Sequence, residues 1–387
     1  MSRRVTTVAV AVALLAMAGA AIAAAESRWD TRVLALIPRP GFPAKAYVAP
    51  NGRIYEGTYD NPSGDTVRSR VLEYTGDGTL QRSWTITGQD LSQPHGVQVA
   101  TSDSRGRLLL LDKSPARALL LNTRTGAQTV YATFADLPSC APTQTAPNCA
   151  PSLRNQPAIP NYAAWGPDGS LYVTDYGQAV IWRVPPGGGE AKVWLADRLL
   201  DGDMFGTTGI ALAPDRSTLL VAQSSSAGLG DGNPATGKLY AVDIRGDGQP
   251  GTLRQLWESG PADAPDGFAI AQSGRIYIAL TGTNQLGVLS PQGQEIERFP
   301  SQPQSGDNGS SIPFDNPSSV AFLGKRLIVA NQSYISGDAT HQALLSVYAG
   351  EDGAPELIPG LKKRRKHHHR RRNHHHRHRH HTRHTHA

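Results

Sequence analysis

Short runs of apolar residues, each followed by a turn rich in Gly, Asp or Pro, recur along most of the chain. Three of the hairpins that they predict are GFAIAQSGRIYIAL, NYAAWGPDGSLYVTD and SSVAFLGKRLIVAN. Equivalent openings fall at six places, 47 to 66 residues apart: Ala44, His95, Asn161, Thr208, Asp266 and Ser318. A period of this length, sustained over the chain, predicts a repeat architecture.

The second half of each repeat predicts two further strands. A third apolar run, a glycine turn and a fourth run follow each hairpin, as in RVLEYTGDGTLQRSW and QLGVLSPQGQEIERF. Four short strands joined by tight turns are typical of one antiparallel blade. Six such blades predict an all-β fold, a closed six-bladed β-propeller in which each blade buries its faces against its neighbours. A two-sheet sandwich would not need six matching units.

Two segments compete to complete the last blade. TRVLALIPRPGFP, residues 31–43, resembles the fourth strand that precedes every other repeat, and PELIPG, residues 355–360, follows the last repeat directly. Both are short and extended in character, so the sequence leaves the closure of the ring open.

The chain divides into three parts by composition. Residues 1–25 carry Arg3 and Arg4 before an Ala-rich apolar stretch that ends in small residues, which predicts a secretory signal peptide and a secreted, extracytoplasmic protein. An uncleaved anchor is the alternative, and twin-arginine export is a variant of the first interpretation. After cleavage no membrane span is expected. Residues 26–361 form the predicted propeller domain, a monomer, and 362–387 a tail.

The two cysteines fit an exported protein. Cys140 and Cys149 bracket the loop CAPTQTAPNC in the longest repeat, and an oxidising compartment would let them form a disulfide. We expect this bridge to stabilise the loop, because nothing around the two residues indicates redox chemistry.

The tail, residues 362–387, holds eleven Lys or Arg and eleven of the thirteen His. It has no apolar residues from which to build a core and is predicted to be disordered. Without it and the signal peptide, 25 cations remain against 32 acids, so the basic character of the chain belongs to the tail. Binding to a polyanion or an anionic surface, binding of transition metals, and an incidental extension remain three open interpretations.

The innermost strand of each blade lines the central channel, so the six openings are expected to form a ring at one of its mouths. Asn161 and Asp266 would be good oxygen ligands there, and Thr208 and Ser318 weaker ones. Such donors suit a hard cation such as calcium. The alternative is that Asn and Asp only start strands after proline, where both residues favour turns.

The segments PNYAAWGPDGSLYVTD and PDGFAIAQSGRIYIAL resemble the senescence marker protein/gluconolactonase/luciferin-regenerating enzyme family, six-bladed propellers that include calcium- or zinc-dependent sugar lactonases. The resemblance covers residues 30 to 360 as a repeat pattern. It implies a metal held by a Glu of the first blade and by Asn, Asn and Asp of the third, fourth and fifth, the Asp also acting as a base. Asn161 and Asp266 match this pattern.

Two positions depart from the family pattern. Ala44 stands where the resemblance implies the Glu, beside Lys45, and Thr208 stands at the second Asn. Loss of one carboxylate weakens a cation site, and a lysine would repel a divalent ion unless it points away. Asp201, Asp203 and Asp263 lie close in sequence to the ring and could supply the missing oxygens. We therefore take the candidate metal ligands to be Asn161, Asp266, Thr208 and Asp203.

The resemblance implies a metal-assisted hydrolase of lactones or related small esters, with calcium as the expected ion and zinc as a possible one. Asp266 would deprotonate water, and His95 is the alternative base. Asp112 and Asp175, at the ends of second strands, are more typical of turns. The residues exclude a covalent serine hydrolase of the Gly-x-Ser-x-Gly type. A non-catalytic propeller that binds a ligand or protein, and a strictosidine-synthase-like propeller enzyme, remain alternatives.

Overall fold

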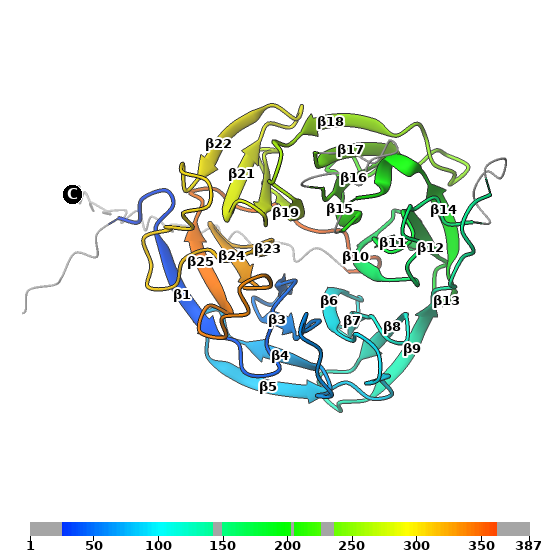
Figure 1. The fold of residues 1–387 in the computed structure, drawn as a ribbon, viewed down its shortest axis with the longest axis horizontal. Helices are drawn as coiled ribbons and strands as arrows, with labels where there is room; N and C mark the ends of the chain where they lie inside the picture. The colour runs from blue at the N-terminus through cyan, green and yellow to red at the C-terminus, as the bar shows by residue number, and fades with distance from the viewer. Residues whose placement is uncertain (1–24, 142–148, 203–204, 226–235, 362–387) are drawn as a thin grey trace, which may run out of the picture.

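Six small sheets surround a central channel in the computed structural model, which describes residues 25–141, 149–202, 205–225 and 236–361 (Figure 1). The prediction of a six-bladed β-propeller is therefore confirmed. Within each blade the strands pair antiparallel, and the innermost strand lines the channel. The signal-peptide and tail predictions fall on residues 1–24 and 362–387, outside the described residues.

The first three blades follow the chain in order. Their strands are β2 (Tyr47–Val48), β3 (Ile54–Gly57), β4 (Arg70–Tyr74) and β5 (Leu80–Thr85); β6 (Val97–Ser102), β7 (Leu108–Asp112), β8 (Arg117–Leu121) and β9 (Gln128–Thr133); and β10 (Pro160–Trp165), β11 (Leu171–Asp175), β12 (Val180–Val184) and β14 (Lys192–Ala196). A two-residue strand, β13 (Gly189–Glu190), pairs parallel with β9 and joins the second blade to the third.

The last three blades repeat the same order. Their strands are β15 (Thr207–Leu212), β16 (Thr218–Gln223), β17 (Lys238–Asp243) and β18 (Arg254–Glu258); β19 (Pro265–Ile270), β20 (Ile276–Leu280), β21 (Gln285–Leu289) and β22 (Glu295–Phe299); and β23 (Pro317–Leu323), β24 (Arg326–Asn331) and β25 (Ala343–Tyr348). One 3-10 turn, η1 (Arg198–Leu200), precedes β15. No helix in the described part of the chain is long and apolar enough to cross a membrane.

The apolar pattern of each strand reflects its depth in the blade. Every residue of β7, β11 and β20 is buried, because both faces of a middle strand pack against neighbouring blades. The outer strand β5 has no fully buried residue. The core is accordingly a set of apolar layers between blades, and it leaves the innermost strands free to carry polar residues into the channel.

The N-terminal strand closes the ring. β1 (Thr31–Leu36) pairs antiparallel with β25 and becomes the outer strand of the last blade. The first described strand and the last thus lie side by side (Figure 1). PELIPG takes no part in this blade and lies elsewhere.

The segment that ends the described chain, residues 352–361, crosses the ring beneath the inner strands (Figure 1). The Gln272 N–H donates to the Asp352 carbonyl and the Ala354 N–H to the Ile270 carbonyl, both at 2.8 Å, so its start is fixed to the fifth blade. Near its end, Gly360 lies against Ser104 of the second blade. We call residues 352–361 the strap.

The predicted disulfide is present. Cys140 and Cys149 are joined, with their Cα atoms 4.8 Å apart, in the loop between the second and third blades. Cys149 is fully buried, and backbone hydrogen bonds between Cys140 and Ala150 align the two sides of the loop. The bridge therefore closes the base of this long insertion.

Candidate functional site

The turn of each inner hairpin fixes which residue of the inner strand reaches the channel mouth. These turns begin with Ala49, Asp103, Gly166, Ala213 and Ala271, whose N–H groups close the turns. The residues five positions earlier line one cavity: Ala44, Gln98, Asn161, Thr208 and Asp266. Gln98 of the second blade thus occupies the place that the repeat pattern assigns to His95.

His95 lies outside the residues that line this cavity. Its side chain is buried, with Nδ1 3.0 Å from the Gln93 carbonyl oxygen and Nε2 2.9 Å from that of Val67. Nε2 is also 3.4 Å from Asp65. The imidazole therefore connects two loops of the first two blades.

The cavity, which we call the upper pocket, has a volume of about 190 Å³. Its floor is the ring of inner-strand residues together with Tyr162. Its walls come from loops and are mainly aromatic or small, and include Tyr59, Tyr176, Phe205, Tyr334, Ile335 and Ala264. Phe205 packs edge-on against Tyr176 and Tyr334, at centroid distances of 5.4 and 6.0 Å. The pocket thus suits a small molecule with an apolar body.

Among the described residues, Asp266 is the one acidic side chain that lines the upper pocket. Burial raises the pKa of its carboxyl group to about 8, against an opposing effect of the nearby Tyr162 hydroxyl. Its Oδ1 is buried and has no hydrogen-bond partner in the described part of the chain. Near neutral pH the group can donate a proton, and above about pH 8 it can accept one.

Gly267 keeps Asp266 and Tyr162 close together. A Cβ atom at position 267 would lie 2.5 Å from the Tyr162 hydroxyl and 2.7 Å from the Ser319 Cβ. The Tyr162 hydroxyl itself donates to the Ser318 carbonyl at 3.0 Å. Only glycine leaves room for this contact, so the Asp-Gly pair positions the carboxyl group over the channel.

The other polar residues of the ring are partly paired, and the Gln98 Oε1 is buried with no hydrogen-bond partner among the described residues. The Gln98 amide donates to the Asn161 Oδ1 at 2.6 Å, and the Thr208 hydroxyl lies 3.4 Å from the Pro265 carbonyl. Ala44 offers no side-chain donor. Lys45 does point away, since its Nζ donates to the Ala100 carbonyl at 2.6 Å on the channel side opposite the pocket.

This donor set does not fit a divalent cation. Calcium takes six to eight oxygen ligands, and the ring supplies one carboxylate and the amide oxygens of Gln98 and Asn161, of which the second already accepts a hydrogen bond from Gln98. No group of three or more His, Cys, Asp or Glu side chains among the described residues is arranged to hold a metal. The predicted ligands Asn161, Thr208 and Asp266 do meet in one pocket, and Asp203 lies outside the described residues.

The remaining acidic candidates have structural partners. Asp201 accepts hydrogen bonds from the Leu153 and Gly202 N–H groups, and Asp263 forms a two-pronged ion pair with Arg298 at 2.8 Å. Asp112 is paired with Arg117. Asp175 accepts from three backbone N–H groups and from Trp182 Nε1, and burial raises its pKa to about 6.

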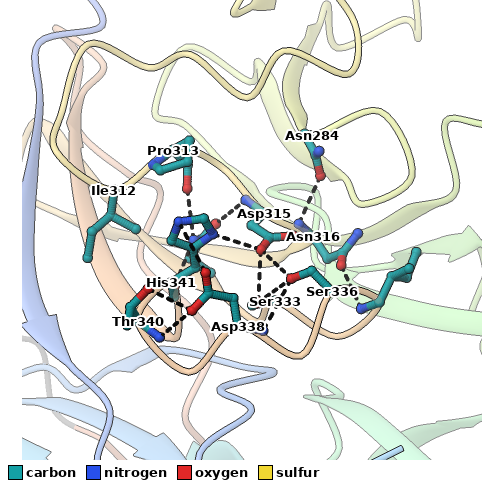
Figure 2. A network of polar contacts seen from close by, with 12 residues as sticks. Asn284, Ile312, Pro313, Asp315, Asn316, Ser333, Ser336, Asp338, Thr340 and His341 are labelled. Atoms are coloured by element: carbon teal, nitrogen blue, oxygen red, sulfur yellow. Dashed lines mark hydrogen bonds and ion pairs between the residues drawn. The ribbon is translucent and has the colours of Figure 1, made fainter.

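One wall of the upper pocket is held by a network of polar contacts (Figure 2). Tyr334 and Ile335 lie on the loop between β24 and β25. Asp315 Oδ2 accepts hydrogen bonds from the hydroxyls of Ser333 and Ser336, at 2.8 and 2.7 Å, and lies 2.9 Å from His341 Nδ1. Both serines thus bond to the aspartate and not to the imidazole, unlike the nucleophile of a serine hydrolase. The network fixes the loop.

Gln98 and Tyr162 are site residues that the repeat pattern does not identify. Gln98 would have been found by counting back from the hairpin turn, since the β-bulge falls after Val99 in β6 but directly after Pro265 in β19. Tyr162 follows Asn161 directly, and the sequence pattern predicts only that it packs in the core. Only the packing of the fifth blade places its hydroxyl beside Asp266.

The fold and pocket define a class: a six-bladed propeller with a polar ring at one mouth of its channel. Residues 64–331 match the model of the SMP-30/Gluconolactonase/LRE-like region, and the chain belongs to this family. Among curated proteins, no sequence matches the chain.

Solved structures share the fold at low sequence identity. A calcium-binding protein, regucalcin, from Agrobacterium tumefaciens has 16% identity and a TM-score of 0.55, over 84% of this chain and 98% of that one. A luciferin-regenerating enzyme has 13% identity and a TM-score of 0.53, over 82% and 95%. Virginiamycin B lyase from Staphylococcus aureus has 13% identity and a TM-score of 0.50, over 82% and 98%.

Proposed function

We propose that the protein hydrolyses small lactones or related esters in the upper pocket, with Asp266 as its acid–base group. The family supports this class of reaction. The observation that carries the proposal is the Asp266 carboxyl group, which has a free buried oxygen and a pKa raised to about 8 and is the one acid among the described residues that line the pocket.

The ionised form of Asp266 would accept a proton from the water that attacks the ester carbonyl carbon. As the acyl carbon–oxygen bond breaks, the protonated Asp266 would return that proton to the departing alkoxide oxygen. The ester carbonyl would lie toward the ring, where the amides of Gln98 and Asn161 are the nearest polar side chains. The apolar walls would exclude bulk water and strengthen these contacts. A volume of about 190 Å³ restricts the reacting part of the substrate to a small ring or acyl group.

Metal assistance by calcium is the finer form of this hypothesis, and the family resemblance and the calcium-binding regucalcin support it. The ring of this chain argues against it, because Ala44 supplies no carboxylate and Gln98 occupies the Asn161 oxygen. We therefore assign the chemistry to Asp266 and expect activity to survive treatment with a chelator. Calcium bound one-to-one, and lost in Asp266→Asn, would contradict this assignment.

The test is hydrolysis of a panel of simple lactones and aryl esters at pH 8 by the native protein and by Asp266→Asn. We expect the substitution to lower kcat/KM by about 10²- to 10⁴-fold, the usual contribution of a general base. Asp247→Asn, on an exposed turn, is the matched control. Native-like turnover by a folded Asp266→Asn protein would refute the role of Asp266.

A pocket that binds the panel without turning it over would instead favour the non-catalytic alternative. The pairing of Gln98 with Asn161 is the observation behind that second candidate, because it ties the two amides of the ring to each other. Saturation-transfer NMR with the same lactones separates the two, since it reports binding whether or not hydrolysis occurs.

We also propose that the protein is exported. The signal-like segment 1–25 and the Cys140–Cys149 bridge support this, because disulfides persist in oxidising compartments. The N-terminus of protein recovered from culture medium or periplasm, read by mass spectrometry, tests the proposal. An intact Met1 or a cytoplasmic product would contradict it.

A further inference from the structure

A second, larger cavity occupies the opposite end of the channel. It has a volume of about 620 Å³, and we call it the lower chamber. The inner strands run from the upper pocket into it, and Tyr162 borders both cavities. Its walls are largely apolar and include Trp165, Phe268 and Phe322 from three different blades. This is the size range of sites that hold whole small molecules.

The strap forms the remaining wall of the chamber. Ala354, Leu357 and Ile358 line it from the side away from the upper pocket. Ile358 is buried, and the strap is fixed at the fifth blade and reaches Ser104 of the second. The strap, packed against two blades, therefore closes this side of the chamber.

One lysine lies where the chamber meets the channel. Lys45 Nζ donates to the Ala100 carbonyl and lies 5.5 and 6.0 Å from the ring centroids of Tyr162 and Tyr47. An ammonium has three donors, and Lys45 uses one of them on the Ala100 carbonyl oxygen. Within the described residues, no carboxylate forms an ion pair with Lys45.

The two acids nearest to Lys45 do not neutralise it fully. Glu56 Oε1 accepts from the backbone N–H groups of Lys45 and Gly57, and burial raises the pKa of Glu56 to about 8, so it is mostly uncharged at neutral pH. Glu356 of the strap also lines the chamber; part of its side chain is accessible to solvent, yet burial of the carboxyl group raises its pKa, and Lys45 opposes that shift. Desolvation lowers the pKa of Lys45, and both acids oppose that shift.

We propose that the lower chamber binds an apolar monocarboxylate, with its carboxylate on Lys45 and its hydrocarbon part along the inner strands above the strap. The apolar walls favour a hydrocarbon body, and a poorly compensated cation at the inner end favours one anionic group. A highly charged ligand would leave further charges without partners in this chamber. The proposal is independent of hydrolysis in the upper pocket.

The two charged groups of the chamber should have opposite effects on the affinity for a carboxylate. Lys45 attracts the carboxylate, whereas Glu356 on the strap repels it. Lys45→Met should therefore weaken binding and Glu356→Gln should tighten it. If the chamber bound its ligand only through the hydrocarbon part, neither substitution would change the affinity.

The experiment is calorimetric titration of decanoate, and separately of decanol, into the full-length protein. We expect decanoate to bind at one site about tenfold more tightly than decanol, equivalent to about 1.4 kcal/mol. Lys45→Met should remove this preference, and Glu356→Gln should increase it severalfold. Lys192→Met and Glu190→Gln are the matched controls, and neither should change this preference. Both side chains are exposed, Lys192 on the outer strand β14 of the third blade and Glu190 on β13 beside it.

Decanol binding as tightly as decanoate, or Lys45→Met binding like the native protein, would overturn the proposal. The His- and Arg-rich tail is present in every variant, so it cannot account for a difference between them. If Lys45→Met does not fold, decanoate brominated at its last carbon gives a second test in native protein. It should quench the fluorescence of Trp165 saturably, and Trp165→Phe should lose that quenching; quenching unchanged in Trp165→Phe would reject the site.

Discussion

Each end of the channel buries one ionisable side chain, an acid at one end and a base at the other. At the upper pocket an acid, Asp266, lies in about 190 Å³ and burial raises its pKa to about 8; at the lower chamber a base, Lys45, borders about 620 Å³ and burial lowers its pKa. Both shifts favour the uncharged form. Adjacent residues of the chain therefore serve different cavities, because Ala44 lines the upper pocket and Lys45 lines the lower chamber.

The sharpest way to separate the two ends is the pH dependence of hydrolysis. The basic form of Asp266 grows as pH rises toward its pKa of about 8, so kcat/KM should increase about fiftyfold between pH 6 and pH 8 and then level off. Stopped-flow or pH-stat rates, corrected for spontaneous hydrolysis, measure this. A flat profile would mean that Asp266 does not supply the base.

Gly267→Ala should damage the upper pocket selectively. The added methyl would lie 2.5 Å from the Tyr162 hydroxyl, so we expect a loss of about 1–3 kcal/mol of stability and of about tenfold in kcat/KM. Denaturant titration and kinetics provide the two measurements. Gly246→Ala is the control, since nothing lies within 4 Å of a Cβ there; equal effects of both substitutions would argue against a specific Tyr162 contact.

Asp266→Asn should also change how stability depends on pH. An acid whose pKa is raised on folding stabilises the native state below its unfolded pKa, and that contribution is lost as pH rises through about 8. The Tm of Asp266→Asn relative to the native protein should therefore rise between pH 4 and pH 8, by roughly 2–4 °C. Glu56, whose pKa is also raised, is present in both proteins, so its effect cancels in the difference in Tm. Parallel Tm curves in scanning calorimetry would contradict the shifted pKa.

The smallest expected effect concerns salt. Lys45 acts inside the chamber, where screening is weak, so raising the salt to about 0.5 M should weaken decanoate binding by less than about threefold. The KM for a neutral lactone should not change. A much steeper salt dependence of decanoate binding would place the carboxylate on exposed cations instead.

The fold was predictable because its signal is repeated six times. Alternating apolar runs and glycine turns recur in every blade, so an ambiguity in one copy is resolved by the others. Closure of the ring was not predictable. TRVLALIPRPGFP and PELIPG have similar local character, and the choice between them depends on pairing with β25, more than 300 residues away from β1.

The site was predictable in part for the same reason. Asn161, Thr208 and Asp266 do converge, because each lies five residues before its hairpin turn. The repeat pattern predicts His95 in the ring, but the bulge of β6 lies further along the strand and places Gln98 there instead. Pairing of Gln98 with Asn161 and the direction of Lys45 depend on contacts between blades, which no single repeat encodes.

The strap determines which way an attached protein would face. Leu361, the last described residue, lies at the lower chamber, on the side of the ring opposite the upper pocket. A protein attached to a bead, a sensor chip or a cell surface directly at Leu361 would therefore turn the Asp266 pocket toward the solution. Attachment at that residue should leave small substrates free access to the upper pocket, whereas it would crowd the lower chamber.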